Sequence, residues 1–247
     1  MSALSARRSA LAEGWPVLIS AFVVGVPFGI VARQAGLAPV EIIAMSVFVF
    51  AGASQFVMVQ LFSDGAGAPL VIATVLLVNF RHALMAAALR PFLGALPLAR
   101  RIGAAFFLTD EAFAMATSWS RRGRREVSYY LTFAVSLFVV WNVATIVGLA
   151  LGPVIAEPRR YGIDLAITAT FIAIVVLGVR HRADAVVAIV AALVGPAVIA
   201  PRGVLTHGAE PLAAAVVVLV VAWRRNLLAG VLAGVAAVAA LRALGVG

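Results

Sequence analysis

Apolar runs of membrane-spanning length alternate with short polar segments along most of this chain. A helix needs roughly 17 to 25 consecutive apolar residues to cross the hydrocarbon core of a bilayer. Runs of this kind lie near residues 15–32, 40–62, 69–89, 102–118, 129–156, 163–180 and 184–200. After Pro201 the pattern weakens, because 211–223 is short for a crossing whereas 227–246 is long enough by itself. The pattern predicts an all-α polytopic integral membrane protein with seven to nine transmembrane helices, some of them broken.

Composition supports this fold class. Of the 247 residues, 64% are hydrophobic and only 12% are charged, and the mean hydropathy is +1.11. These values lie far outside the range of soluble domains, so we expect residues 1–247 to form one integral membrane domain. The chain has no cysteine, which excludes disulfides and thiolate chemistry.

All nineteen basic side chains are arginines, and they are spread between the apolar runs. This spread argues against nucleic acid as a partner, despite a net charge of +9. The positive-inside rule assigns the densest cluster, Arg121, Arg122, Arg124 and Arg125, to the cytoplasm. With nine crossings and a cytoplasmic N-terminus, the arginines divide almost evenly between the two sides. The cluster is therefore a better guide to orientation than the total.

Two of the predicted spans contain residues that interrupt helices, namely Gly25, Pro27 and Gly29 in the first and Gly52 in the second. Broken helices survive in a bilayer only where protein or a water-filled cavity covers the freed backbone groups. In transporters such breaks expose half-helix N-termini, whose positive dipole ends attract a carboxylate. We expect a functional break at Gly52, because Ser54 and Gln55 add polarity there. For the first span, a tolerated kink or close helix packing is an equal alternative.

Four ionisable residues lie inside predicted spans: Arg81, His82, Asp110 and Glu111. Charged groups at membrane depth are costly unless paired or hydrated, so they mark candidate transport sites. Arginine stays protonated, and Asp110 or Glu111 is its natural partner. One arginine against two carboxylates leaves a negative charge for a proton, for His82 or for a substrate ammonium group. The alternative is a structural ion pair between Arg81 and Asp110 that only fixes two helices. Asn142 is a further polar candidate, for which we favour hydrogen bonding between helices.

Motifs for other functions are absent from the sequence. There is no HExxH, no GxSxG, no Cys/His ligand set and no phosphate-binding loop, so we expect neither an enzyme, nor a metal site, nor a cofactor. The polar residues within spans favour a small-solute transporter. A passive channel that uses the same residues as a pore lining, or a non-transporting structural subunit, remains as an alternative.

Four short motifs in this order resemble the AzlC-type branched-chain amino-acid permeases: Pro27-Phe28-Gly29, FAGASQF at 50–56, Asn79-Phe80-Arg81-His82 and LTDEAF at 108–113. The resemblance covers roughly residues 14–200. It implies a bacterial inner-membrane protein that acts with a small multi-span AzlD-type partner in efflux of valine, leucine and isoleucine. By analogy, Ser54, Gln55, Arg81, Asp110 and Glu111 occupy the motif positions expected on the transport pathway.

The C-terminal region, 201–247, is longer than the usual ending of that family. The segment Leu193 to Leu244 resembles the C-terminal part of the AzlD partner, which weakens the case for an obligatory separate subunit. Together with the charge pattern, the resemblance suggests a site for a zwitterionic amino acid. Its carboxylate would face Gly52 to Gln55 and Arg81, and its ammonium group would face Asp110 or Glu111.

Overall fold

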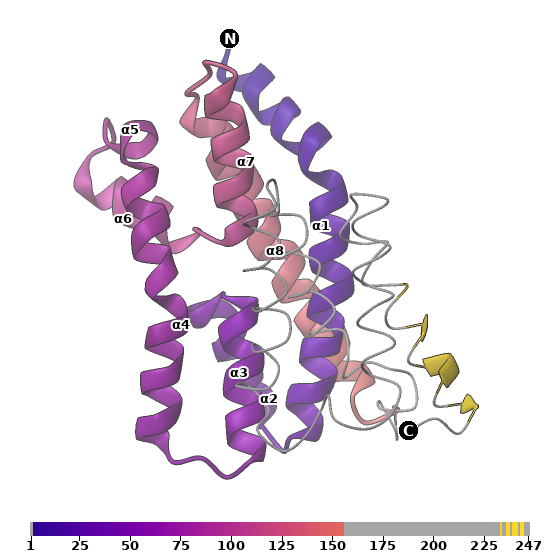
Figure 1. Ribbon diagram of the computed structural model, residues 1–247. Helices are drawn as coiled ribbons and strands as arrows, with labels where there is room; N and C mark the ends of the chain where they lie inside the picture. Colours follow the sequence, from indigo (N-terminus) through magenta and orange to yellow (C-terminus); the bar gives the residue numbers. More distant parts are fainter. Residues whose placement is uncertain (1, 156–232, 234–235, 238, 242, 245–247) are drawn as a thin grey trace, which may run out of the picture.

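The computed structural model describes residues 2–155, 233, 236–237, 239–241 and 243–244 (Figure 1). Every regular element in this part of the chain is a helix. The elements are α1 (Ala3–Gln34), α2 (Pro39–Ala44), the π-helical turn η1 (Met45–Val49), α3 (Gly52–Ser63), α4 (Ala68–Ala88), α5 (Arg90–Leu93), α6 (Leu98–Phe106), α7 (Asp110–Arg121) and α8 (Val127–Leu151). The predicted helical class is confirmed for these residues. The runs predicted beyond 156 lie outside them, so the count of seven to nine helices stays a prediction.

Three of these helices are long and apolar enough to cross a membrane: α1 with 32 residues, α4 with 21 and α8 with 25. At a rise of 1.5 Å per residue, α4 extends about 31 Å, which matches a hydrocarbon core of about 30 Å. These helices correspond to the predicted crossings at 15–32, 69–89 and 129–156. The other two predicted crossings in this region, 40–62 and 102–118, take a different form.

Helices α1 and α8 run parallel and in close contact along their whole length (Figure 1). Gly29 and Gly148 lie where the two backbones touch, because a Cβ on either glycine would overlap backbone atoms of the other helix. Of the two alternatives for Gly25, Pro27 and Gly29, the break is wrong and close helix packing is confirmed, since α1 is continuous through this segment and both glycines lie against α8. The extensive packing on α8 outweighs the one backbone hydrogen bond that Pro27 removes, and the glycines serve close helix contact.

The segment predicted as the crossing 40–62 is a re-entrant hairpin. Contacts with α8 trace its depth: Ser46 Oγ lies 3.0 Å from Thr145 Oγ1, and the Phe50 ring lies 4.9 Å from the Phe138 ring. The chain then turns back, because Gly52 packs against Trp141, which is one turn nearer to the Thr145 end. Helix α3 has 12 residues and is about 18 Å long, about half of a membrane crossing. The hairpin therefore enters and leaves at the same face.

The segment predicted as the crossing 102–118 is a second hairpin, which enters from the opposite face (Figure 1). Near the start of α8, the Tyr130 hydroxyl donates to the Ala104 carbonyl over 2.8 Å. Deeper in the molecule, Phe107 lies 5.4 Å from Phe138. Helix α7 then returns to the face by which this second hairpin entered, where Trp119 stacks on Tyr129 at 3.9 Å.

Backbone geometry explains why both segments reverse. Phe50 adopts a left-handed conformation (φ 39°) that ends η1, and Ala51 is extended (φ −140°) before α3. In the second hairpin, Thr109 is extended (φ −128°) and its Oγ1 accepts from the Ala112 backbone N–H over 3.2 Å, so it caps α7. Counting apolar residues measures the length of a run. It does not detect a reversal in the middle of that run.

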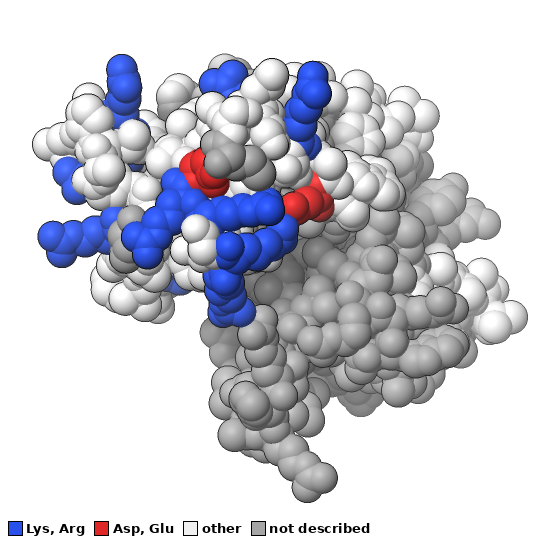
Figure 2. Space-filling model, turned by 90° about the horizontal axis from the view of Figure 1, so that it is seen from above, with Lys and Arg blue, Asp and Glu red and all other residues white. Residues whose placement is uncertain are grey.

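Because both hairpins reverse, the arginines gather at one end of the described structure. Phe92 in α5 packs on Tyr130 at 6.4 Å, which places the end of α4 at the same face as the start of α1 and α8. Figure 2 shows this face with its blue side chains. Nine arginines belong to the elements that end there: Arg7, Arg8, Arg90, Arg100, Arg101, Arg121, Arg122, Arg124 and Arg125. The nearly even division expected for continuous crossings does not hold in these residues.

Candidate transport site

The two re-entrant hairpins meet halfway along α8. The Phe138 ring is the meeting point, with Phe50 at 4.9 Å from one hairpin and Phe106 and Phe107 at 6.0 and 5.4 Å from the other. Helices α3 and α7 begin shortly after these aromatic residues, so the N-termini of two half-helices lie at a similar depth along α8. Opposed half-helix ends near the bilayer midplane are the arrangement in which transporters hold polar substrates.

The middle of α4 contacts the first turn of α3 through polar groups. The Ser54 hydroxyl donates to Asn79 Oδ1 over 2.6 Å. His82 is half-buried, and its Nδ1 lies 3.1 Å from the Asn79 backbone carbonyl. Asn79 therefore joins the predicted Ser54 and His82. The sequence reading included Asn79 in a motif and assigned it no role.

The middle of α4 also contacts the first turn of α7 through an ion pair. Arg81 Nη1 lies 2.9 Å from Asp110 Oδ2, so the structure joins Arg81 to one of the two carboxylates expected for it. The side chains are 36% and 32% exposed, so the ion pair is only partly covered by the described residues. Glu111, the next residue, is half-buried. The pair leaves a second carboxylate beside an arginine that is already engaged.

The two half-helix N-termini differ in their charge and in their caps. Helix α7 is capped by Thr109 and carries Asp110 and Glu111 in its first turn. Helix α3 has no side-chain cap and no acidic residue in its first turn, and its first backbone bond runs from Gln55 N–H to Ala51 O. One end therefore suits a cation, and the other offers free N–H groups to an anion.

Two further predicted residues are placed apart from the ion pair. Gln55 is fully buried and its carboxamide has no hydrogen-bond partner among the described residues. Asn142 Nδ2 donates to the Phe138 carbonyl of its own helix over 2.9 Å, so this hydrogen bond is not the expected bond between helices. Trp141, the neighbour of Asn142, was not identified from the sequence. It is buried, and its Nε1 also lacks a partner in the described part.

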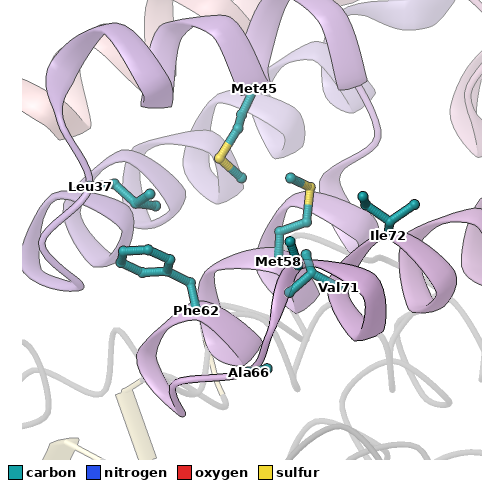
Figure 3. Close-up of a pocket in the computed structure, with 8 residues that line it drawn as sticks. Leu37, Met45, Met58, Phe62, Ala66, Val71 and Ile72 are labelled. Atoms are coloured by element: carbon teal, nitrogen blue, oxygen red, sulfur yellow. The ribbon is translucent and has the colours of Figure 1, made fainter.

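An apolar pocket of about 370 Å³ opens between α4 and the first hairpin, which consists of α2, η1 and α3 (Figure 3). Met45, Met58 and Ile72 lie toward its inner part, and Leu37, Phe62, Ala66, Ala68 and Val71 complete the lining. Met58 is one helical turn from Ser54 in α3. One lining residue of the pocket is therefore a single helical turn from the Ser54 and Asn79 pair.

Comparison with known families agrees with this arrangement. The family model described as AzlC protein matches residues 16–155, more than half of the chain. The chain belongs to the AzlC family. A second model, described as branched-chain amino acid transport protein (AzlD), matches residues 179–242. This match confirms the expected AzlD-like C-terminal segment, most of which lies outside the described residues. Both families are transport-related membrane proteins and not enzyme families.

Similar proteins are membrane proteins of bacteria and archaea. The chain is 32% identical over 139 residues to the inner membrane protein YgaZ of Escherichia coli, a match that covers 55% of this chain and 57% of YgaZ. It is 26% identical to an uncharacterized membrane protein of Archaeoglobus fulgidus, over 71% of this chain and 77% of the relative. An uncharacterized membrane protein of Helicobacter pylori J99 is 28% identical, over 66% and 73%. The chain spans little more than half of YgaZ. No solved structure matches.

Proposed function

We propose that the protein is a secondary transporter that exports branched-chain amino acids across the bacterial inner membrane. The observation that carries this proposal is the pair of opposed half-helix N-termini flanking the Arg81–Asp110 ion pair at mid-depth. The family description adds the substrate class, because the AzlD model is described as a branched-chain amino acid transport protein. The arginine-rich face supports a cytoplasmic N-terminus by the positive-inside rule.

Charge balance assigns the substrate's ammonium group to Glu111. Asp110 already neutralises Arg81, so Glu111 is the carboxylate left for a second cation. Its position in the first turn of α7 suits a carboxyl group that pairs with a cation, since the helix dipole favours negative charge there. His82 is the alternative source of positive charge and a candidate proton carrier for coupled transport. Arg81 is engaged by Asp110, so the carboxylate is better assigned to the α3 end than to Arg81.

The aliphatic side chain of the substrate has an apolar route to this site. The pocket in Figure 3 is lined by methionine, leucine, isoleucine and other apolar side chains, and methionine adapts its shape to different ligands. It opens at the face opposite the arginines, next to the hairpin of α2, η1 and α3. Movement of that hairpin against α4 would open and close the route, as alternating access requires.

The AzlD-like segment in the same chain supports transport without a separate small subunit. Residues 179–242 match the AzlD family model, so this polypeptide carries segments related to both components. We propose that the C-terminal region takes the place of the partner. A separate AzlD-type protein would then add nothing to activity.

The test is counterflow in liposomes. Labelled leucine is offered to liposomes that contain unlabelled leucine and the full chain, with empty liposomes as the control. We expect accelerated exchange by the chain alone, with no increase when an AzlD-type subunit is added. A channel would give leucine flux without exchange acceleration. Absence of any leucine exchange, with folded protein in the membrane, would refute the substrate assignment.

A further inference from the structure

Three polar atoms near the first turn of α3 are buried and have no partner among the described residues. They are Nε2 and Oε1 of Gln55, which is 0% exposed, and Nε1 of Trp141, which is 8% exposed. An unpaired buried donor or acceptor costs about 1 to 3 kcal/mol. Buried polar groups of this kind are therefore usually matched by a ligand or an ordered water.

The three atoms lie beside the uncapped end of α3. The Trp141 ring packs on Gly52, the first residue of that helix, because a Cβ there would lie 2.9 Å from Trp141 Cη2. Gln55 is three residues further along, so it shares the face of α3 on which Gly52 lies. Free backbone N–H groups, an indole N–H and a carboxamide N–H thus belong to one region.

Aromatic packing holds the indole in place at this end. Phe28 of α1 stacks near Trp141 with ring centroids 6.2 Å apart, and it meets Phe56 of α3 edge-on at 5.4 Å. All three rings are buried. Hydrogen bonds to an ionised group gain strength in an apolar surrounding of this kind.

We propose that the α3 N-terminus, Gln55 and Trp141 form the subsite that binds the α-carboxylate of the substrate. The inference rests on the proposed amino-acid transport. Trp141 Nε1 and Gln55 Nε2 donate to the carboxylate, together with the free N–H groups of α3. Gln55 Oε1 accepts from the adjacent ammonium group, so one carboxamide matches the donor and acceptor that every α-amino acid presents. Selection for an α-amino acid over an amine or a fatty acid follows.

The experiment compares leucine with 3-methylbutylamine, which has the same side chain and ammonium group and lacks the carboxylate. Both compete with labelled leucine in the counterflow assay. The variants are Trp141→Phe, which removes the indole N–H and keeps an aromatic ring, and Gln55→Met, which removes the carboxamide and keeps the size of the side chain. Trp15→Phe, at an exposed tryptophan, and Gln60→Met, on the same helix, are the matched controls. Gel filtration and thermal stability in detergent verify folding of each variant.

We expect the concentration of leucine for half-competition to rise about tenfold in each variant, as loss of one charge-assisted hydrogen bond predicts. Competition by 3-methylbutylamine should be unchanged in Trp141→Phe, and in Gln55→Met it should weaken less than that of leucine, because this variant loses the ammonium acceptor as well as the carboxylate donor. A third variant, Gln55→Glu, should lose leucine competition and keep that of the amine, because it sets a carboxylate against a carboxylate. This variant keeps the test decisive when a substitution by methionine does not fold.

Several outcomes would overturn the inference. Equal losses for leucine and the amine would show that the subsite does not read the carboxylate. If leucine competes equally well in the variants and in the Trp15 and Gln60 controls, the buried atoms hydrogen-bond to water only and not to the substrate. In both cases wild-type exchange of leucine is intact, so the proposed function stands. Loss of exchange in the wild type itself would instead refute the proposed function.

Discussion

Separate and joint removal of the two charges in the Arg81–Asp110 pair distinguishes a structural ion pair from a transport site. At about 4 Å and an effective dielectric constant of about 20, two unit charges attract by about 4 kcal/mol. The side chains are 36% and 32% exposed, so solvent screening reduces this value, and we take about 2 kcal/mol as the coupling energy. Asp110→Asn should destabilise the protein by at least that amount, since it leaves the Arg81 charge unpaired at mid-depth.

The assay is a double-mutant cycle with two readouts. Unfolding in mixed micelles with increasing SDS gives the free energy for wild type, Arg81→Gln, Asp110→Asn and the double variant. Counterflow of labelled leucine gives the activity of the same four proteins. We expect the double variant to recover stability relative to either single variant, because no uncompensated charge is left, and to remain inactive.

Two results would refute this reasoning. A coupling energy below about 0.5 kcal/mol would mean that the pair contributes nothing beyond an ordinary exposed salt bridge. Recovery of both stability and exchange in the double variant would show that the pair only fixes α4 against α7. The matched control is the Arg122–Glu13 pair, at 2.8 Å, whose removal should change stability without abolishing exchange.

Three further predictions concern the fold and its surface. Because the chain has no native cysteine, single cysteines at Ala95, Arg125 and Asp64 report topology directly. An impermeant maleimide should label the first two from the arginine-rich face and the third from the opposite face, whereas two continuous crossings would place Arg125 with Asp64 and leave Ala95 on the other side. Gly148→Leu should lower the free energy of unfolding by about 3 kcal/mol, at the upper end of overpacking costs, because the new side chain meets the α1 backbone. Gly103→Leu, with open space around it, should be tolerated in the same SDS titration. The hydrogen bond of Glu126 with its own backbone N–H, supported by one from the Trp119 indole, holds the pKa of that carboxyl below its usual range. The resulting stabilisation is present above the unfolded-state pKa and is lost as the pH falls through the lowered folded-state pKa. The thermal midpoints of wild type and Glu126→Gln should therefore differ at neutral pH and converge below about pH 4.

Sequence reasoning located the membrane helices whose length and apolarity agree. It also gave Asp110 or Glu111 as the partner of Arg81, because an arginine inside a predicted span needs a carboxylate and few are present, and the structure pairs it with Asp110. It identified the break at Gly52, where polar side chains follow a glycine. These features depend on residue chemistry, which the amino-acid sequence shows directly.

The reversal of the two hairpins was not predictable from the same information. Phe50 in a left-handed conformation and Thr109 in an extended one interrupt runs that remain apolar on both sides. Gly25 and Gly29 illustrate the converse, since glycine next to proline read as a break and instead permits contact with α8. Trp141 was missed because an aromatic residue in a span is ordinarily core, and only its unpaired Nε1 marks it.

The two half-helix ends differ in sign, and this difference explains how one site could hold a zwitterion, a substrate that carries both charges and no net charge. Two bare N-termini would bind two anions, and two acidic ends would bind two cations. Here Thr109, Asp110 and Glu111 invert the electrostatic sign of the α7 end, while the α3 end is left uncapped with Gln55 in its first turn. Arg81 balances one of the two carboxylates, so in the proposed site one carboxyl group and a bare helix end would face the substrate. A neutral amino acid carries the complement of both, whereas an amine or an acid alone leaves one end unsatisfied.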